Sequence, residues 1–143
     1  MNHPSLKLTI ALLALAAAGA AAAQSALPPV QTAGGVEILS GGVGSDQAKA
    51  IEAEGRQWPL TLEFAVAGKL RADHAANVQV SVRTANGQIL QTTSQGPFLL
   101  LRLPPGQYDV SAQLDGKTLN QRITVAQGKP SKASFTWPEG TNS

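Results

Sequence analysis

The sequence predicts an all-β protein, a seven- or eight-stranded antiparallel β-sandwich with one short helix near its N-terminus. From Trp58 onward, apolar and polar residues alternate, which is typical of strands that bury one face. Turn signals made of glycine, proline, Asn-Gly and Asp-Gly recur at intervals of about 8 to 12 residues. No helical pattern separates the later strands, which favours antiparallel sheets over a parallel one.

Residues 1–23 have the pattern of a secretory signal peptide. Lys7 precedes an apolar stretch over residues 8–18, and the alanines at 21–23 form a small-residue cleavage site. The apolar stretch is shorter than the roughly 20 residues that a membrane-spanning helix needs, so we expect cleavage rather than an anchor. The mature chain is then periplasmic or secreted, without a membrane span.

The composition narrows the function further. The chain has no cysteine, which excludes a disulfide framework and a lipid-anchored lipoprotein. Of its 11 Lys and Arg residues only Lys7 lies in the signal segment, so ten basic side chains remain beside nine acidic ones. These charges are dispersed, so we expect no nucleic-acid partner. The roughly 120 residues left after cleavage suffice for one domain, which we expect to be a monomer.

The segment before the domain contains glycine and proline without periodicity. Residues 24–35 are therefore expected to be a flexible leader, and a short strand is expected over 36–39. The glycine-rich segment 41–44 follows, but Ser45 and Asp46 stand where a phosphate-binding loop needs Lys and Ser or Thr. We expect a flexible turn there, with Ser45 or Asp46 as the cap of a helix over about 47–56.

Alternation predicts seven further strands, separated by turn signals. They cover residues 60–66, 78–83, 89–92, 98–103, 108–114, 119–125 and 133–137. Asn86-Gly87 and Asp115-Gly116 are expected to be tight hairpin turns. The domain then spans residues 36–138, with a tail over 139–143.

The strand at residues 98–103 breaks the alternation. If Leu99, Leu101 and Leu103 face the core, Phe98 and Leu100 point to the opposite face. Either the short helix or the leader covers these two side chains, or they form an exposed apolar patch that contacts a partner. Phe98 and Leu100 are thus the candidate partner-binding residues.

A corner follows this strand. Pro104 and Pro105 lack backbone donors, and Gly106 adopts conformations that other residues avoid, so the chain must turn after Leu103. A tyrosine just after such a corner buries its ring and donates its hydroxyl to the backbone upstream. We expect this structural role for Tyr108.

These residues support a resemblance. The segments 78–87 and 99–110, together with Asp115-Gly116, resemble the carboxypeptidase regulatory-like domain, an immunoglobulin-like or prealbumin-like sandwich of seven strands. The glycines at 41–44, Gly96-Pro97 and the end at 135–137 are similar to small exported proteins of Gram-negative bacteria that carry this domain alone. The resemblance implies a fold and hardly any activity.

No catalytic or cofactor site is expected. After cleavage the chain keeps only His74, and Asp73 beside it points to the other side of an extended segment. We expect His74 to lie in a solvated polar connection over 69–77. One histidine without cysteine cannot form a typical zinc site, and no calcium-binding spacing is present. The hydroxyisourate hydrolases of prealbumin-type fold use several histidines and a C-terminal tail that this chain lacks.

Two tryptophans leave one alternative open. Trp58 and Trp137 stand at the ends of strands, where they either plug the core or stack against a sugar. We therefore expect a non-catalytic exported module that binds protein or acts as a structural accessory of the bacterial envelope. The alternative is a carbohydrate-binding module that uses Trp58 and Trp137. The partner is then an envelope protein or a polysaccharide.

Overall fold

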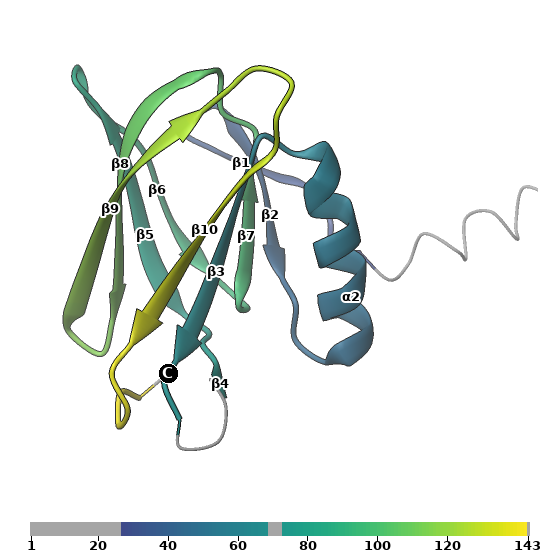
Figure 1. Cartoon of the computed structure of the whole chain (residues 1–143), viewed down its shortest axis with the longest axis vertical. Helices are drawn as coiled ribbons and strands as arrows, with labels where there is room; N and C mark the ends of the chain where they lie inside the picture. The colour runs from purple at the N-terminus through teal and green to yellow at the C-terminus, as the bar shows by residue number, and fades with distance from the viewer. Residues whose placement is uncertain (1–26, 69–72, 143) are drawn as a thin grey trace, which may run out of the picture.

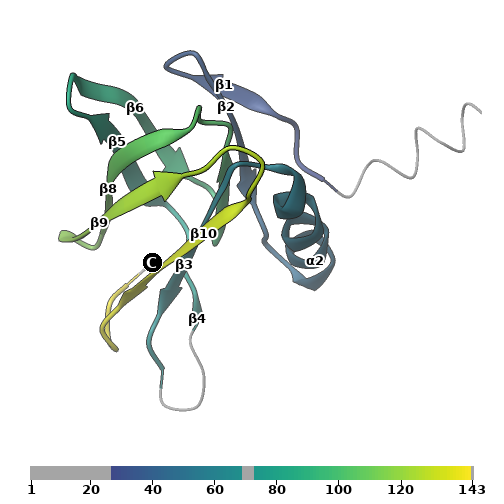
Figure 2. The ribbon, with the colours of Figure 1, turned by 45° about the horizontal axis from the view of Figure 1, so that its top comes forward.

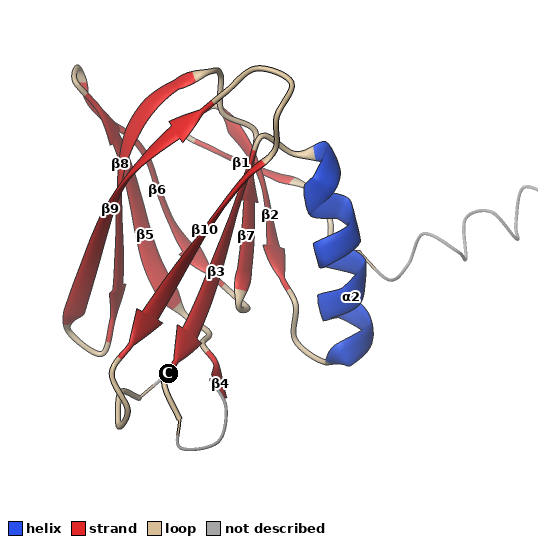
Figure 3. Ribbon diagram, in the orientation of Figure 1, coloured by secondary structure: helices blue, strands red, loops and turns tan. Residues whose placement is uncertain are grey.

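The computed structural model describes residues 27–68 and 73–142, which form two β-sheets and one α-helix (Figure 1, Figure 3). The expected signal peptide and residues 24–26 of the expected leader lie outside this part. In chain order the elements are β1 (Gln31–Ala33), β2 (Val36–Gly41), α2 (Ser45–Glu54), the 3-10 turn η1 (Gly55–Gln57), β3 (Leu60–Val66), β4 (Asp73–His74), β5 (Val78–Thr84), β6 (Gly87–Ser94), β7 (Phe98–Leu101), β8 (Gly106–Leu114), β9 (Lys117–Val125) and β10 (Ser131–Trp137).

The two sheets pack against each other as a β-sandwich-like pair of layers (Figure 2). The first sheet has the order β1-β2-β7-β3-β10, and β4 pairs with the C-terminal end of β3. The second sheet has the order β6-β5-β8-β9. The inward side chains of both sheets form one core, whose aromatic members include Phe64, Phe135 and Trp137. The mostly β prediction with one short helix is thus confirmed.

The last strand breaks the expected antiparallel pattern. β10 pairs with β3 in parallel, from Ser131 opposite Leu60 to Trp137 opposite Val66, and their arrowheads point the same way in Figure 1. The purely antiparallel prediction is therefore wrong for this pair. The connection after β9 carries the chain to the other sheet, where β10 enters beside β3 in the same direction. Alternation along a strand does not reveal the direction of its neighbour.

β1 and β4 are additional to the expected strands. β1 pairs with β2 across Gly34 and Gly35, whose φ angles of 58° and 80° are left-handed and make a tight hairpin turn. The second half of the expected leader, residues 31–35, therefore forms a strand and a hairpin turn. β4 pairs with β3, so the expected polar connection around residues 69–77 contains a short strand.

The two predicted hairpins and the predicted corner are confirmed. Thr84 pairs with Gly87 across Ala85 and Asn86, so the first hairpin turns one residue earlier than the expected Asn-Gly pair. Leu114 pairs with Lys117 across the Asp-Gly turn as expected. The Tyr108 hydroxyl donates a hydrogen bond to the Pro104 carbonyl at 2.6 Å, and its ring is buried. This burial raises the pKa of the Tyr108 phenol.

The helix begins differently from the prediction. α2 starts at Ser45, its N-cap is Gly44, and neither Ser45 nor Asp46 caps it with a side-chain hydrogen bond. Instead, the Gln47 Oε1 atom accepts hydrogen bonds from the amides of Gly42 at 2.8 Å and Val43 at 3.1 Å. The glycine-rich turn thus uses these two amides to fasten the chain to the first turn of the helix.

A close backbone contact joins this turn to the loop before β7. A Cβ atom on Gly96 would overlap the backbone of Gly41, so only glycine fits where the two segments meet. Ser94 is fully buried beside them and donates a hydrogen bond to the Gly96 carbonyl at 2.8 Å. The Ser40 hydroxyl accepts a hydrogen bond from the backbone N–H of Gln95 at 2.7 Å. Gly41 and Gly96 therefore allow the two backbone segments to pack closely against each other.

Candidate functional site

The candidate partner-binding residues on β7 are covered. Phe98 is 1% exposed and Leu100 is fully buried. Both belong to a second apolar cluster, which α2 and the segment before β1 complete on the outer face of the first sheet. Its other members are Leu39, Ile51 and Trp58, with Leu27 and Ala48 partly buried against them. The expectation of an exposed patch at Phe98 and Leu100 is therefore wrong, and the helix and leader cover these side chains.

The two tryptophans are also buried. Trp58 is 2% exposed, and its Nε1 atom donates a hydrogen bond to Glu54 Oε1 at 3.1 Å. Trp137 is fully buried, and its Nε1 atom donates to the Lys117 carbonyl at 2.9 Å. Neither ring presents a face on which a sugar could stack. Trp137 lies in the core between the sheets and Trp58 lies in the apolar cluster under α2, so burial and not sugar stacking accounts for both rings.

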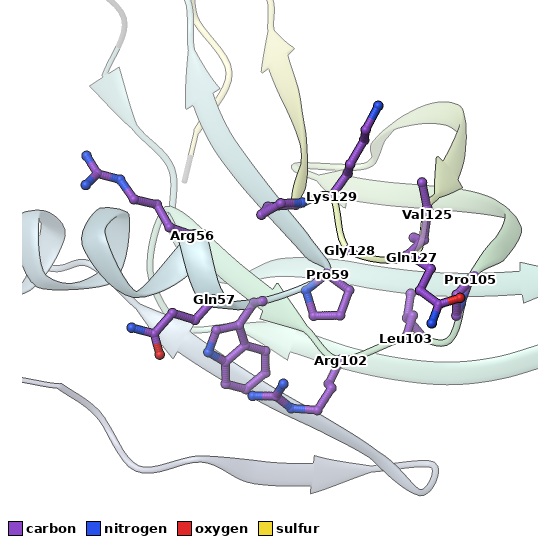
Figure 4. A pocket seen from close by; sticks show the side chains of 13 residues that line it. Arg56, Gln57, Pro59, Arg102, Leu103, Pro105, Val125, Gln127, Gly128 and Lys129 are labelled. Atoms are coloured by element: carbon purple, nitrogen blue, oxygen red, sulfur yellow. The ribbon is translucent and has the colours of Figure 1, made fainter.

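A hollow lies at the end of the sandwich where β3 and β10 begin, and we call it the basic pocket. It measures about 370 Å³, and Figure 4 shows side chains from three separate segments around Pro59. These segments are η1 with the residues after it, the loop after β7, and the turn between β9 and β10. The lining residues are Arg56, Gln57, Trp58, Pro59, Arg102, Leu103, Pro105, Val125, Ala126, Gln127, Gly128, Lys129 and Pro130.

The charge of this basic pocket has one sign. Arg56, Arg102 and Lys129 line it, and none of the lining residues within the described ranges 27–68 and 73–142 is an aspartate or a glutamate. Arg102 lies with its guanidinium carbon 4.3 Å from the centre of the Trp58 ring, and its Nε atom pairs with Glu37 Oε1 at 3.3 Å. Arg56 and Lys129 are exposed and form no side-chain hydrogen bond or ion pair with the described residues. Two of the three cations are thus available to an anion.

The walls of the basic pocket are apolar and stiff. Pro59, Pro105 and Pro130 come from three different segments, and the ring of a proline removes one degree of backbone freedom. Gln57 and Gln127 add side-chain amides, which can both donate and accept hydrogen bonds. Figure 4 shows Arg56 and Lys129 extending away from Pro59, at the rim. This set of groups suits a ligand with an apolar body and carboxylates at its periphery.

Sequence reasoning does not find this pocket. Its three cations stand at positions 56, 102 and 129, each alone among neutral or apolar neighbours. Dispersed charges predict no basic patch when they are counted along the chain. Only the pairing of β3 with β7 and β10 brings these three positions to one end of the sheet.

The structure adds little on metal or acid-base chemistry. The side chains of Asp73 and His74 lie outside the described part, although their backbone forms β4. Within residues 27–68 and 75–142, no group of three or more His, Cys, Asp or Glu side chains could hold a metal ion. No helix in the described ranges has the length and apolar character of a membrane span.

A scan against models of known protein families found no match for this chain. A search of curated proteins found no similar sequence either. The resemblance to the carboxypeptidase regulatory-like domain therefore stays a prediction.

Proposed function

We propose that this chain is a non-catalytic exported module of the bacterial envelope that holds an acidic segment of a partner protein in the basic pocket. One observation supports this most strongly. Three cations from distant positions meet around one hollow without a carboxylate in its lining, and two of them have no partner among the described residues. Glu37 compensates the charge of Arg102, so Arg56 and Lys129 leave an uncompensated positive charge at the rim that attracts an anion.

The size and walls of the pocket favour a peptide over a small inorganic anion. A volume of about 370 Å³ lies within the range of pockets that hold organic ligands. The three proline rings offer apolar contact to one side chain of the partner, while the rim pairs with carboxylates on either side of it. A segment in which acidic and apolar residues alternate provides both kinds of group.

The proposed binding is weak and sensitive to salt. An exposed ion pair contributes about 0.2 to 1 kcal/mol, so pairs with Arg56 and Lys129 together with some apolar contact correspond to a transient complex. Salt screens such pairs over about 8 Å at physiological ionic strength. We therefore expect micromolar to millimolar affinity that falls as salt is added, which suits a module that associates reversibly.

Fluorescence anisotropy with a dye-labelled peptide of alternating Glu and Leu tests the proposal. The double variant Arg56→Glu with Lys129→Glu should weaken binding by about tenfold or more, because two attractive contacts become repulsive. The matched control is Lys49→Glu with Arg83→Glu, which changes the net charge equally at exposed positions outside the pocket. The control should bind within about twofold of wild type, since distant exposed charges are screened.

Two results would contradict the proposal. In one, wild type does not bind the peptide even at low salt. In the other, the pocket variant and the control variant lose affinity equally, which would assign the binding to net charge alone. A Gln and Leu peptide of the same length serves as the neutral reference, and it should bind more weakly than the acidic one.

A further inference from the structure

The outer face of the second sheet carries two complete rows of uncharged polar side chains. Strand register places the members of each row side by side across all four strands. The first row is Thr93, Gln79, Gln113 and Thr118, and the second is Gln91, Ser81, Ser111 and Asn120. All eight side chains are amides or hydroxyls, and none is charged, aromatic or aliphatic.

Charge on this face is confined to the next row. There, Arg83, Asp109 and Arg122 lie on neighbouring strands, and Arg122 Nε is 2.9 Å from Asp109 Oδ1. Solubility alone does not require the neighbouring rows to be neutral, because exposed sheets commonly carry Lys and Glu at such positions. The two rows of amides and hydroxyls, which we call the neutral rows, are therefore a distinct surface.

The neutral rows keep unused hydrogen-bonding groups. Ser81 donates to Gln88, Gln88 donates to Gln91, and Ser111 donates to Asn120, so each side chain of the second row already has one partner within the sheet. The side chains of the first row form no hydrogen bond with the described residues, although each can donate and accept. A shallow hollow of about 100 Å³ lies over both rows. Hydroxyl groups of a ligand could therefore find several partners at once.

We propose that the neutral rows bind a neutral, hydroxyl-rich polysaccharide that lies across the strands. Neighbouring strands are about 4.8 Å apart, which is close to the length of one sugar unit, so successive units meet successive strands. A protein partner would be expected to use aromatic or apolar anchors, which these rows lack. A nucleic acid would need cations, which the rows also lack.

Each sugar unit is held weakly on such a surface. Exposed hydrogen bonds replace bonds to water and contribute little singly, and no aromatic ring on these rows stacks on a sugar. Affinity then comes from a polymer that engages several units together. The inference is independent of the basic pocket, because the two surfaces share no residue.

Co-sedimentation with insoluble cellulose and with insoluble chitin tests the proposal. Wild type should sediment with at least one of these neutral polymers. Gln113→Glu places a charge in the first row and should lower the bound fraction about fivefold or more, because a carboxylate must lose water against a neutral ligand. Gln107→Glu is the matched control, since it lies on the same strand and the same face outside the neutral rows.

Each sedimentation result either supports or overturns the proposal. Sedimentation of wild type and Gln107→Glu with loss of Gln113→Glu supports the proposal. It is overturned if wild type remains in the supernatant with both polymers, or if the two variants sediment equally. Far-ultraviolet circular dichroism should be unchanged in both variants, because each replaces one exposed glutamine with glutamate.

Discussion

The two sheets of this protein differ in how many of their faces are buried. In β7 of the first sheet all four residues are buried, because the core covers one face and α2 with Trp58 covers the other. In β8 of the second sheet buried and exposed residues alternate, and the outer face is open. Both strands are central in their sheets. The helix therefore makes the first sheet a covered layer, while the second sheet keeps one face open.

The largest expected effect comes from charging the covered face. Leu100→Asp should cost more than about 4 kcal/mol of unfolding free energy, because it removes a buried side chain and places a carboxylate without a partner. Gln113→Asp on the open face should change it by only about 0.5 kcal/mol or less. Denaturant unfolding followed by tryptophan fluorescence measures both. Equal small losses would show that α2 does not seal the first sheet.

A smaller effect is expected at the close backbone contact between Gly96 and Gly41. Gly96→Ala should cost about 1 to 3 kcal/mol, because the added methyl group must push the Gly41 backbone away. The neighbouring exposed position supplies the control, and Gln95→Ala should leave stability nearly unchanged. Thermal unfolding of the two variants makes the comparison. If Gly96→Ala melts like wild type, the close contact between the two glycines is not needed.

The corner at the start of β8 carries a smaller effect still. Tyr108→Phe should cost about 1 kcal/mol at neutral pH, the usual net contribution of a buried hydrogen bond. The bond joins β8 to the connection after β7 and touches no member of the cluster under α2, so the variant should leave that cluster intact. Denaturant unfolding measures the loss. An unchanged midpoint would show that the hydrogen bond from Tyr108 to Pro104 does not stabilise the fold.

The same residue predicts a pH dependence. The phenol has a raised pKa in the folded state, so the unfolded state loses its proton first as pH increases. The stability that Tyr108 contributes is thus present below about pH 10 and declines as pH rises through the folded pKa. Tyr108 is the single tyrosine of the chain, so Tyr108→Phe should flatten this part of the profile. An identical alkaline decline in the variant would assign it to lysines.

Features that depend on near neighbours in the chain could be predicted from the sequence. The Asn-Gly and Asp-Gly hairpins, the corner at Tyr108 and most strands follow from turn chemistry and alternation within a few residues. The unbroken apolar run at residues 98–101 predicts a strand with apolar side chains on both faces, either covered by the helix or leader or exposed to a partner, and the structure shows the covered form. The sequence leaves open what covers it, because the cover comes from residues about 40 positions or more upstream.

Features that depend on distant pairing could not be predicted. The parallel entry of β10 beside β3 depends on how the sheets close, and the basic pocket depends on that entry. The hydrogen bonds of Gln47 to the glycine-rich turn replace the expected Ser or Asp cap, because the long amide reaches back to two amides at once. The neutral rows become visible only when the strand register aligns side chains from four strands.

Cysteine labelling under native conditions tests the contrast between the two sheets most directly. The chain has no cysteine, so Leu100→Cys and Gln113→Cys each introduce a single thiol. We predict that the thiol at 113 reacts about 100-fold faster or more, because the thiol at 100 reacts only when the helix opens. Both should react alike in denaturant. Similar native rates at the two positions would contradict the account, since they would mean that the outer face of the first sheet is as open as that of the second.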